Sequence, residues 1–113
     1  MIIRIAVLLL SAFLPVVVLA CDNAVETTYA AAGLKVFPEV VAEAIDEKEI
    51  ARKRNDGEGY YVQLACDSGE VLMLTKYIGK DMFFRIEYIY ETKGLIGKRT
   101  TKSNGEVKEY FAK

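Results

Sequence analysis

The sequence has no histidine and no tryptophan, and only two cysteines and two prolines among its 113 residues. Histidine is the most frequent general base in enzymes and a common zinc ligand, and tryptophan is a frequent anchor at protein interfaces. Their absence removes residue types on which many catalytic, metal and interface sites depend. We therefore predict no metal site and no cofactor.

The side chains that could still support catalysis occupy unpromising positions. Glu39 and Glu43 are expected to share a solvated helix face, whereas general acid–base catalysis places its carboxylates in desolvated clefts. Ser68 and Ser103 each lie beside or near a glycine in an expected turn, and the chain has no histidine to activate them. We name no catalytic residue and predict that the protein is not an enzyme.

A strong excess of charge of one sign is also lacking. The chain has 15 basic and 16 acidic residues, which gives a formal net charge of -1. Proteins that bind nucleic acid usually carry a basic surface that neutralises phosphates. The near balance of charge therefore argues against nucleic acid as a partner.

What the chain does contain is a long apolar segment at its start. Arg4 is followed by residues 5–20, which include no charged residue and end at Ala20, directly before Cys21. This run is shorter than the roughly 20 residues that a membrane-spanning helix needs, and Pro15 interrupts it. The pattern is typical of a secretory signal. We predict that residues 1–20 are a cleaved signal peptide and that residues 21–113 form a single small exported α+β domain, periplasmic or secreted.

Two fates are open for Cys21. An exported protein with two cysteines usually oxidises them to each other, which predicts a disulfide between Cys21 and Cys66. Alternatively, residues 17–21 resemble a bacterial lipobox, although Val18 and Leu19 fit the pattern loosely. In that case Cys21 is lipidated and the domain is anchored to a membrane. We expect membrane contact only in this second case.

Two helices are expected after the signal. Asn23 can cap a helix over residues 24–32, which would stop at Gly33. A second helix would begin at Pro38, whose fixed φ suits a first helical position. Its end is ambiguous, because residues 48–54 read equally as the basic last turns of the helix or as a charged edge strand.

From residue 60 onward the apolar residues alternate with a period of two, which indicates strands. The expected strands are residues 60–66, 70–77, 82–90, 95–101 and 106–111. We predict an α+β fold in which one or two N-terminal helices pack on an antiparallel meander of 4–6 strands, in two layers.

The order of elements expected over residues 37–77 is helix, charged strand, aromatic strand and apolar strand, with Asp-Gly and Ser-Gly turns between the strands. In this pattern the segment resembles small exported PepSY-type modules and modules like the β-lactamase inhibitor protein. The resemblance implies a binding or inhibitory role outside the cytoplasm, and we assign no family from it.

Two groups of residues are candidates for contact with a partner. The first is an aromatic-rich patch on the sheet, made of Tyr61, Phe83 and Ile89, which would bind a protein or a cell-envelope component. The second lies in the basic C-terminal part of the chain.

Charge is distributed unevenly along the chain. Residues 39–70 hold nine acidic and four basic residues, whereas residues 93–113 hold six basic and two acidic ones. Lys98, Arg99 and Lys102 are therefore candidates for contact with an anionic surface. The prediction for function is a small exported, non-enzymatic binding or inhibitory module. The alternative is a membrane-tethered lipoprotein, acylated at Cys21, with an assembly or scaffolding role in the envelope.

Overall fold

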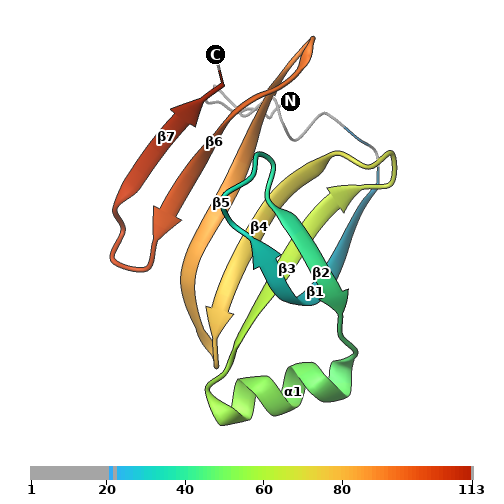
Figure 1. The fold of residues 1–113 in the computed structure, drawn as a ribbon, viewed down its shortest axis with the longest axis vertical. Coiled ribbons are helices and arrows are strands. Elements are labelled where there is room, and N and C mark those ends of the chain that lie inside the picture. The colour runs from blue at the N-terminus through green and yellow to red at the C-terminus, as the bar shows by residue number, and fades with distance from the viewer. Residues whose placement is uncertain (1–20, 22, 113) are drawn as a thin grey trace, which may run out of the picture.

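The computed structural model describes residues 21 and 23–112, and within these residues the chain forms seven strands and one helix (Figure 1). The elements are β1 (Ala24–Gly33), β2 (Val40–Ala44), α1 (Glu47–Asp56), β3 (Gly59–Cys66), β4 (Val71–Ile78), β5 (Asp81–Glu91), β6 (Gly94–Lys102) and β7 (Val107–Phe111). All seven strands form one antiparallel sheet in the order β2-β1-β3-β4-β5-β6-β7.

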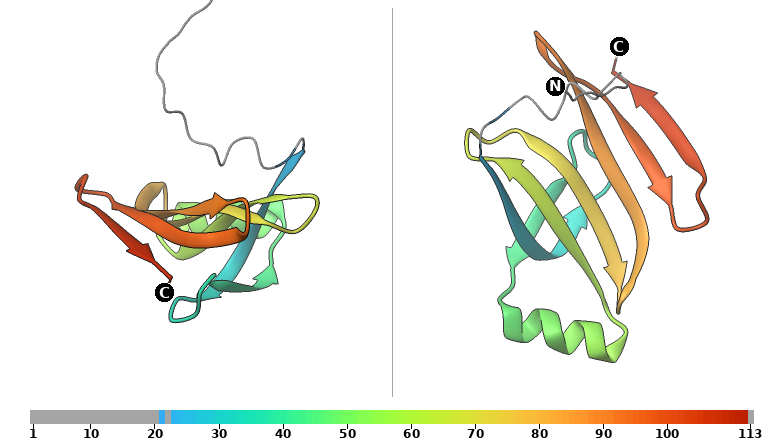
Figure 2. Two further views of the ribbon diagram at one scale, coloured as in Figure 1. Left: turned by 90° about the horizontal axis from the view of Figure 1, so that it is seen from above. Right: turned by 180° about the vertical axis from the view of Figure 1, so that it is seen from behind.

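The sheet is bent into a trough (Figure 2). β7 forms one wall, the β1–β2 hairpin forms the other, and the strands between them form the floor. The register shifts once in each of the pairs β3–β4, β4–β5 and β5–β6. Such bulges bend a strand and increase its twist, and here they occur among the strands that form the floor. The trough gives the sheet a concave and a convex face.

The predicted fold class is wrong. The chain does not form two layers with one or two N-terminal helices on a sheet of 4–6 strands. Seven strands make up the sheet, and the one helix within the described residues lies at an end of the trough and buries none of its residues (Figure 1). The five strands expected from residue 60 onward are confirmed as β3 to β7.

The first predicted helix is strand β1. Residues 30–32 are alanines with a high helix propensity, but Val25, Thr27 and Thr28 before them favour strands. β1 lies between β2 and β3, and Tyr29 is paired with Tyr61 of β3. Without β1, one edge of β3 would have no backbone partner. Pairing over the full strand therefore outweighs the local preference of the alanines.

The second predicted helix is also absent at its expected place. Residues 34–39 form a loop, and the β-branched Val40 and Val41 begin the edge strand β2, which pairs with β1. Glu39 and Glu43 therefore do not share a helix face. The resemblance over residues 37–77 depended on an order of helix and strand that this segment does not have.

Helix α1 resolves the ambiguity over residues 48–54, which are helical. Asp46 caps its N-terminus by accepting a hydrogen bond from the Glu49 backbone N–H at 2.9 Å. Gly57, with a positive φ of 73°, ends the helix in a left-handed conformation that suits glycine. On its exposed surface the Arg52 guanidinium bonds to Glu49 and Glu58 and lowers the pKa of both carboxyls.

The core of the domain lies between the floor of the trough and the β1–β2 hairpin. Its buried members are Tyr61, Leu74, Ile86 and Tyr88. Partly buried hydrophobic side chains pack around them, from both the hairpin and the floor: Tyr29, Ala32, Val41, Val71, Phe84, Tyr90 and Leu95. In β5, Phe84, Ile86, Tyr88 and Tyr90 follow the expected period of two and lie on the core face.

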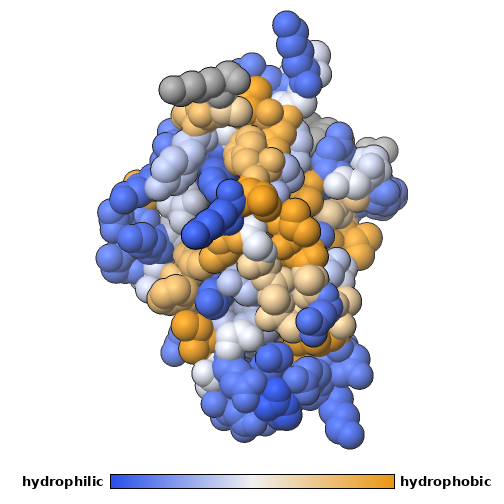
Figure 3. Space-filling view, in the orientation of Figure 1, coloured by the Kyte–Doolittle hydropathy of each residue, from blue (hydrophilic) through white to orange (hydrophobic). Residues whose placement is uncertain are grey.

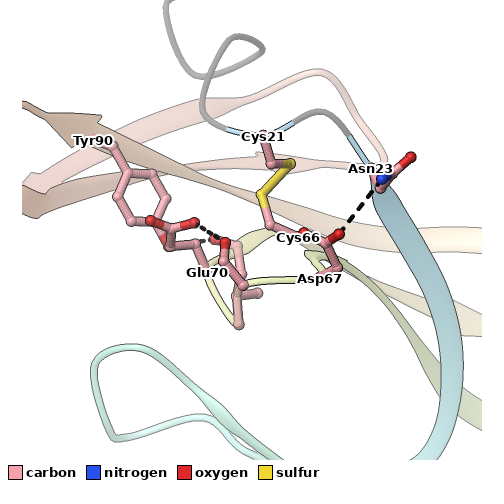
Figure 4. Close-up of a disulfide and its surroundings, with 8 residues drawn as sticks. Cys21, Asn23, Cys66, Asp67, Glu70 and Tyr90 are labelled. Atoms are coloured by element: carbon pink, nitrogen blue, oxygen red, sulfur yellow. Dashed lines mark hydrogen bonds between the residues drawn. A yellow bond between two sulfur atoms is a disulfide. The ribbon is translucent and has the colours of Figure 1, made fainter.

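The predicted disulfide is confirmed: Cys21 is bonded to Cys66, with 5.7 Å between the two Cα atoms (Figure 4). It ties the start of the described chain to the end of β3, next to the pairing of Ala24 with Cys66. Asn23 also donates a hydrogen bond to Asp67 at 3.5 Å. One sulfur atom cannot carry both a lipid and a disulfide, so the structure favours the first of the two fates of Cys21. The predicted signal peptide lies outside the described residues.

Within residues 21 and 23–112, no helix has both the length and the apolar character to cross a membrane.

Candidate functional site

The trough contains a hollow of about 700 Å³, which is the main candidate site. It lies between the loop that joins β1 to β2, the floor strands β5 and β6, and β7. Its lining comprises Leu34, Lys35, Val36, Phe37, Glu39, Phe83, Phe84, Ile86, Lys98, Thr100, Lys102, Ser103, Asn104 and Tyr110. Figure 3 looks into the trough and shows hydrophobic residues gathered over its centre, with hydrophilic ones beside and below them.

Several of the lining side chains are hydrophobic and exposed to solvent. Leu34, Val36 and Phe37 of the loop, Phe83 of β5 and Tyr110 of β7 are each between 41% and 50% exposed. Large exposed side chains that converge on one concavity are uncommon in a protein that binds nothing there. This convergence makes the hollow a candidate binding surface.

Phe83 faces the hollow because of a β-bulge. Lys76 of β4 is paired with Phe84, and Tyr77 is paired with Met82, so Phe83 is the extra residue in β5. Its ring lies 5.8 Å from that of Phe84, centroid to centroid, although strict alternation would place the two on opposite faces. The bulge thereby adds a second aromatic ring to one side of the trough.

A buried carboxylate lies at the end of the floor away from Phe83 and Phe84. Glu39 is only 4% exposed, and its two oxygens have different partners. One accepts a hydrogen bond from the hydroxyl of Tyr88, and the other forms an ion pair with the ammonium of Lys98. The Tyr88 oxygen in turn accepts the backbone N–H of Glu39 at 3.4 Å. These bonds attach the loop to β5 and β6.

The environment of Tyr88 changes its acidity. Burial raises the pKa of Tyr88 well above the ordinary tyrosine value, and the hydrogen bond to the anionic Glu39 raises it further. Tyr88 therefore stays a neutral hydrogen-bond donor at physiological pH. The Glu39 charge is held by a cation and a donor, and is not displayed to the hollow as a free anion.

The remaining charges of the lining are positive. Lys98 lies 5.8 Å from the ring centroid of Phe37 and 5.9 Å from that of Tyr110, so aromatic rings flank the ammonium that neutralises Glu39. Lys102 has an exposed partner, Glu106, at 3.6 Å. Lys35, on the loop, takes part in no ion pair among the described residues. The hollow is therefore apolar with a net positive charge.

The predicted partner-binding residues do not form one patch. Tyr61 is buried in the core, with its ring 6.4 Å from that of Phe84. Phe83 is 49% exposed and lines the hollow. Ile89 is half-buried and paired with Gly97, away from the hollow. The Lys76 ammonium lies 5.4 Å from the ring centroid of Tyr61 and 5.5 Å from that of Phe83, whereas Ile89 lies apart. The role of all three residues in binding stays a prediction.

The three predicted anion contacts are also divided. Lys98 and Lys102 alternate with Thr100 along β6 and line the hollow. Arg99 lies between them in sequence, so it points to the opposite face, where it pairs with Glu87 and Glu109. Only Lys98 and Lys102 can act together, and contact with an anion stays a prediction for both.

The sequence reasoning missed the loop over residues 34–37 and the buried Glu39. The available signal was the composition of this linker, in which three large hydrophobic residues surround one lysine. Loops are usually polar, so such a segment indicates a covered or binding loop. The expected helix start at Pro38 concealed that signal.

A second hollow, of about 980 Å³, lies between α1 and the sheet. Its lining is more polar and includes Glu26, Asp46, Glu47, Arg54 and Lys80. Tyr60 and Tyr77 stack at its base with 5.5 Å between ring centroids, and Tyr60 donates a hydrogen bond to the Gly79 carbonyl. A more polar lining with charges of both signs makes this hollow the weaker candidate. No group of three or more metal-ligating side chains occurs within the described residues.

Comparison of the chain with protein-family models, with curated proteins and with solved structures finds no match. The function must therefore be inferred from the geometry of the sheet.

Proposed function

We propose that this protein is a small exported binding module, periplasmic or secreted, which uses the concave face of its sheet to hold a protein or a cell-envelope component. One observation carries the proposal: five exposed hydrophobic side chains from three separate elements converge on one hollow. Burying them against a partner would remove apolar surface from water, which is the main driving force of association.

The charges in the hollow support binding rather than catalysis. Its one carboxylate, Glu39, is engaged by both Lys98 and Tyr88. A general base needs a carboxylate within reach of the proton it removes, and a retaining or inverting hydrolase needs two. The arrangement fixes the loop in place and leaves the apolar walls open to a partner.

Site-specific photocrosslinking in the native host tests this function. A photoreactive phenylalanine analogue would replace Phe37, which lines the hollow, and in a matched control Phe111, which is 58% exposed but does not line it. We expect a discrete crosslinked partner from position 37 and none from position 111. Equal products from both positions, or none from either, would contradict the proposal.

The alternative role, a membrane-tethered lipoprotein, depends on Cys21. Intact mass of the protein from its host, measured with and without a reductant, separates the two. A gain of two hydrogens on reduction shows the disulfide, whereas a lipid adduct shows the anchor. The bond between Cys21 and Cys66 supports the first result.

A further inference from the structure

We propose that the hollow binds one medium-chain fatty acid, with its chain on the apolar floor and its carboxylate at Lys102. This inference rests on the proposed function, because it names the ligand class of the same surface. The distribution of polar groups in the hollow, its charge and its size support this assignment.

The Glu39–Lys98 pair lies at one end of the hollow, where its charges compensate each other, and a second set of polar groups lies at the opposite end. Lys102, Ser103 and Asn104 follow one another where β6 enters its turn toward β7. The pairing of Lys102 with Phe84 places this end next to the aromatic pair of β5. An ammonium, a hydroxyl and an amide can all donate hydrogen bonds to a carboxylate. The hollow therefore has a polar end at the turn.

From that end an apolar floor extends along the strands. In the register of β5 and β6, Lys102 is paired with Phe84. Four residues further along β5, Tyr88 is paired with Lys98. At 3.4 Å per residue, the floor between these pairs is roughly 14 Å long. Ile86 lies between them, and Leu34, Val36 and Phe37 of the loop contribute to the same lining. This shape suits an extended alkyl chain with one polar end.

The sign of the charge favours an anionic head group. Lys98 is used by Glu39, so its charge is compensated inside the protein. Lys35 and Lys102 remain, and the exposed pair of Lys102 with Glu106 at 3.6 Å is of the kind that contributes little. A cationic amphiphile would meet two lysines and no uncompensated acid in the lining. Charge complementarity therefore selects a carboxylate.

The size of the hollow favours a small molecule over a protein segment. Its volume of about 700 Å³ lies within the range of roughly 300–1,000 Å³ that is usual for small-molecule sites. Such sites combine apolar walls with a few polar groups that orient the ligand. A protein segment or a bilayer would contact the rim of the hollow and would not fill it. The experiments below give a different result for each of these two ligands.

The test compares three probes with the same alkyl chain, each below its micelle concentration: dodecanoate, dodecyltrimethylammonium and dodecyl maltoside. Titration of the oxidised exported protein by calorimetry and by backbone amide NMR gives stoichiometry, affinity and location. We expect one dodecanoate per protein, with the largest amide shifts at Phe84 and Thr100, and binding of the cation about tenfold weaker. Equal binding of the cation, or shifts confined to the α1 side, would overturn the inference.

Matched variants separate the head group from the chain. Lys102→Ala should weaken dodecanoate about fivefold, whereas Lys93→Ala, an exposed lysine outside the hollow, should leave it unchanged. Phe83→Ser should weaken all three probes, and Phe111→Ser none of them. Urea unfolding of each variant confirms that it is folded. If Lys102→Ala and Lys93→Ala behave alike, the assigned carboxylate position is wrong.

Two further measurements distinguish this inference from the function on which it rests. Binding to phosphatidylglycerol vesicles without saturable binding of monomeric dodecanoate would show a lipid surface and would overturn the inference. A protein crosslinked at position 37, together with no dodecanoate binding, would also overturn it while leaving the binding module intact. If position 37 gives no crosslinked partner and dodecanoate does not bind, both the inference and the proposed function are wrong.

Discussion

Glu39 and Lys98 are 59 residues apart in the chain, and their side chains form an ion pair that joins the loop before β2 to strand β6. The Lys98 side chain is 17% exposed and that of Glu39 only 1%. A buried charge is tolerated when it is paired and hydrogen-bonded, and here Tyr88 supplies the additional hydrogen bond. The pair fixes the loop whose hydrophobic residues line the candidate site.

Removing Lys98 alone should destabilise the fold more than removing both Glu39 and Lys98. Lys98→Met leaves the Glu39 carboxylate buried without its partner, and we expect it to lower the free energy of unfolding by about 3–5 kcal/mol in urea titrations. The double variant Glu39→Leu/Lys98→Met should lose less than Lys98→Met alone. Lys102→Met, in an exposed pair, is the control and should change stability by no more than about 0.5 kcal/mol. Equal losses for Lys98→Met and Lys102→Met would show that the buried pair has no structural role.

Gly97 is the residue that lets β7 lie close to β6. A Cβ added there would come within 2.5 Å of the Tyr110 carbonyl oxygen and 2.7 Å of Phe111 Cδ1. Gly97→Ala should therefore displace β7, destabilise the protein by about 1–3 kcal/mol and speed amide hydrogen exchange in residues 107–111. Gly33→Ala is the matched control, because its Cβ would approach only the Val40 carbonyl, at 3.8 Å. A wild-type exchange pattern in Gly97→Ala would contradict this packing.

The strands from β3 onward could be predicted because each repeats its apolar residues with a period of two and is bounded by turn residues. In β5 the alternation of Phe84, Ile86, Tyr88 and Tyr90 identified the core face. β1 and β2 could not be predicted in the same way, since Ala30 to Ala32 and Pro38 carry local helix signals. Their strand conformation comes from long-range pairing with β3 and with each other, which no local pattern contains.

Less of the candidate site than of the sheet could be predicted from the sequence. Strict alternation places Phe83 and Phe84 on opposite faces, and only the bulge in β5 brings both rings to the hollow. Lys98 could be identified as a candidate from its charge. Its partner Glu39 could not, because the pairing depends on how the β1–β2 hairpin folds over the sheet.

The disulfide should contribute a large part of the stability. It closes a loop between residues separated by 45 positions, for which the chain-entropy model gives about 4 kcal/mol. Reduction should therefore lower the urea midpoint strongly, and the double variant Cys21→Ser/Cys66→Ser should show the same low midpoint with or without a reductant. A reductant-insensitive wild type would show that the bond does not form in the isolated protein.

Alkaline conditions should destabilise the fold through Tyr88. Its pKa is raised in the folded state by burial first and by the Glu39 carboxylate second, from the ordinary value of 10.0. Below about pH 10 the hydroxyl is protonated in both states, so its full contribution to stability is present there. Above that pH the unfolded chain releases the proton and the folded one retains it, so stability falls by about 1.4 kcal/mol per pH unit for this group.

The measurement is urea unfolding from about pH 8 to about pH 11 for the wild type and for Tyr88→Phe, which cannot ionise at this position. Burial first, and Glu70 second, also raise the pKa of Tyr90, so the variant retains part of the alkaline loss. The stability advantage of the wild type over Tyr88→Phe should shrink as the pH rises above about 10. Parallel pH profiles would mean that Tyr88 ionises in the folded protein as readily as in the unfolded chain, and that its bond to Glu39 does not hold the proton in place.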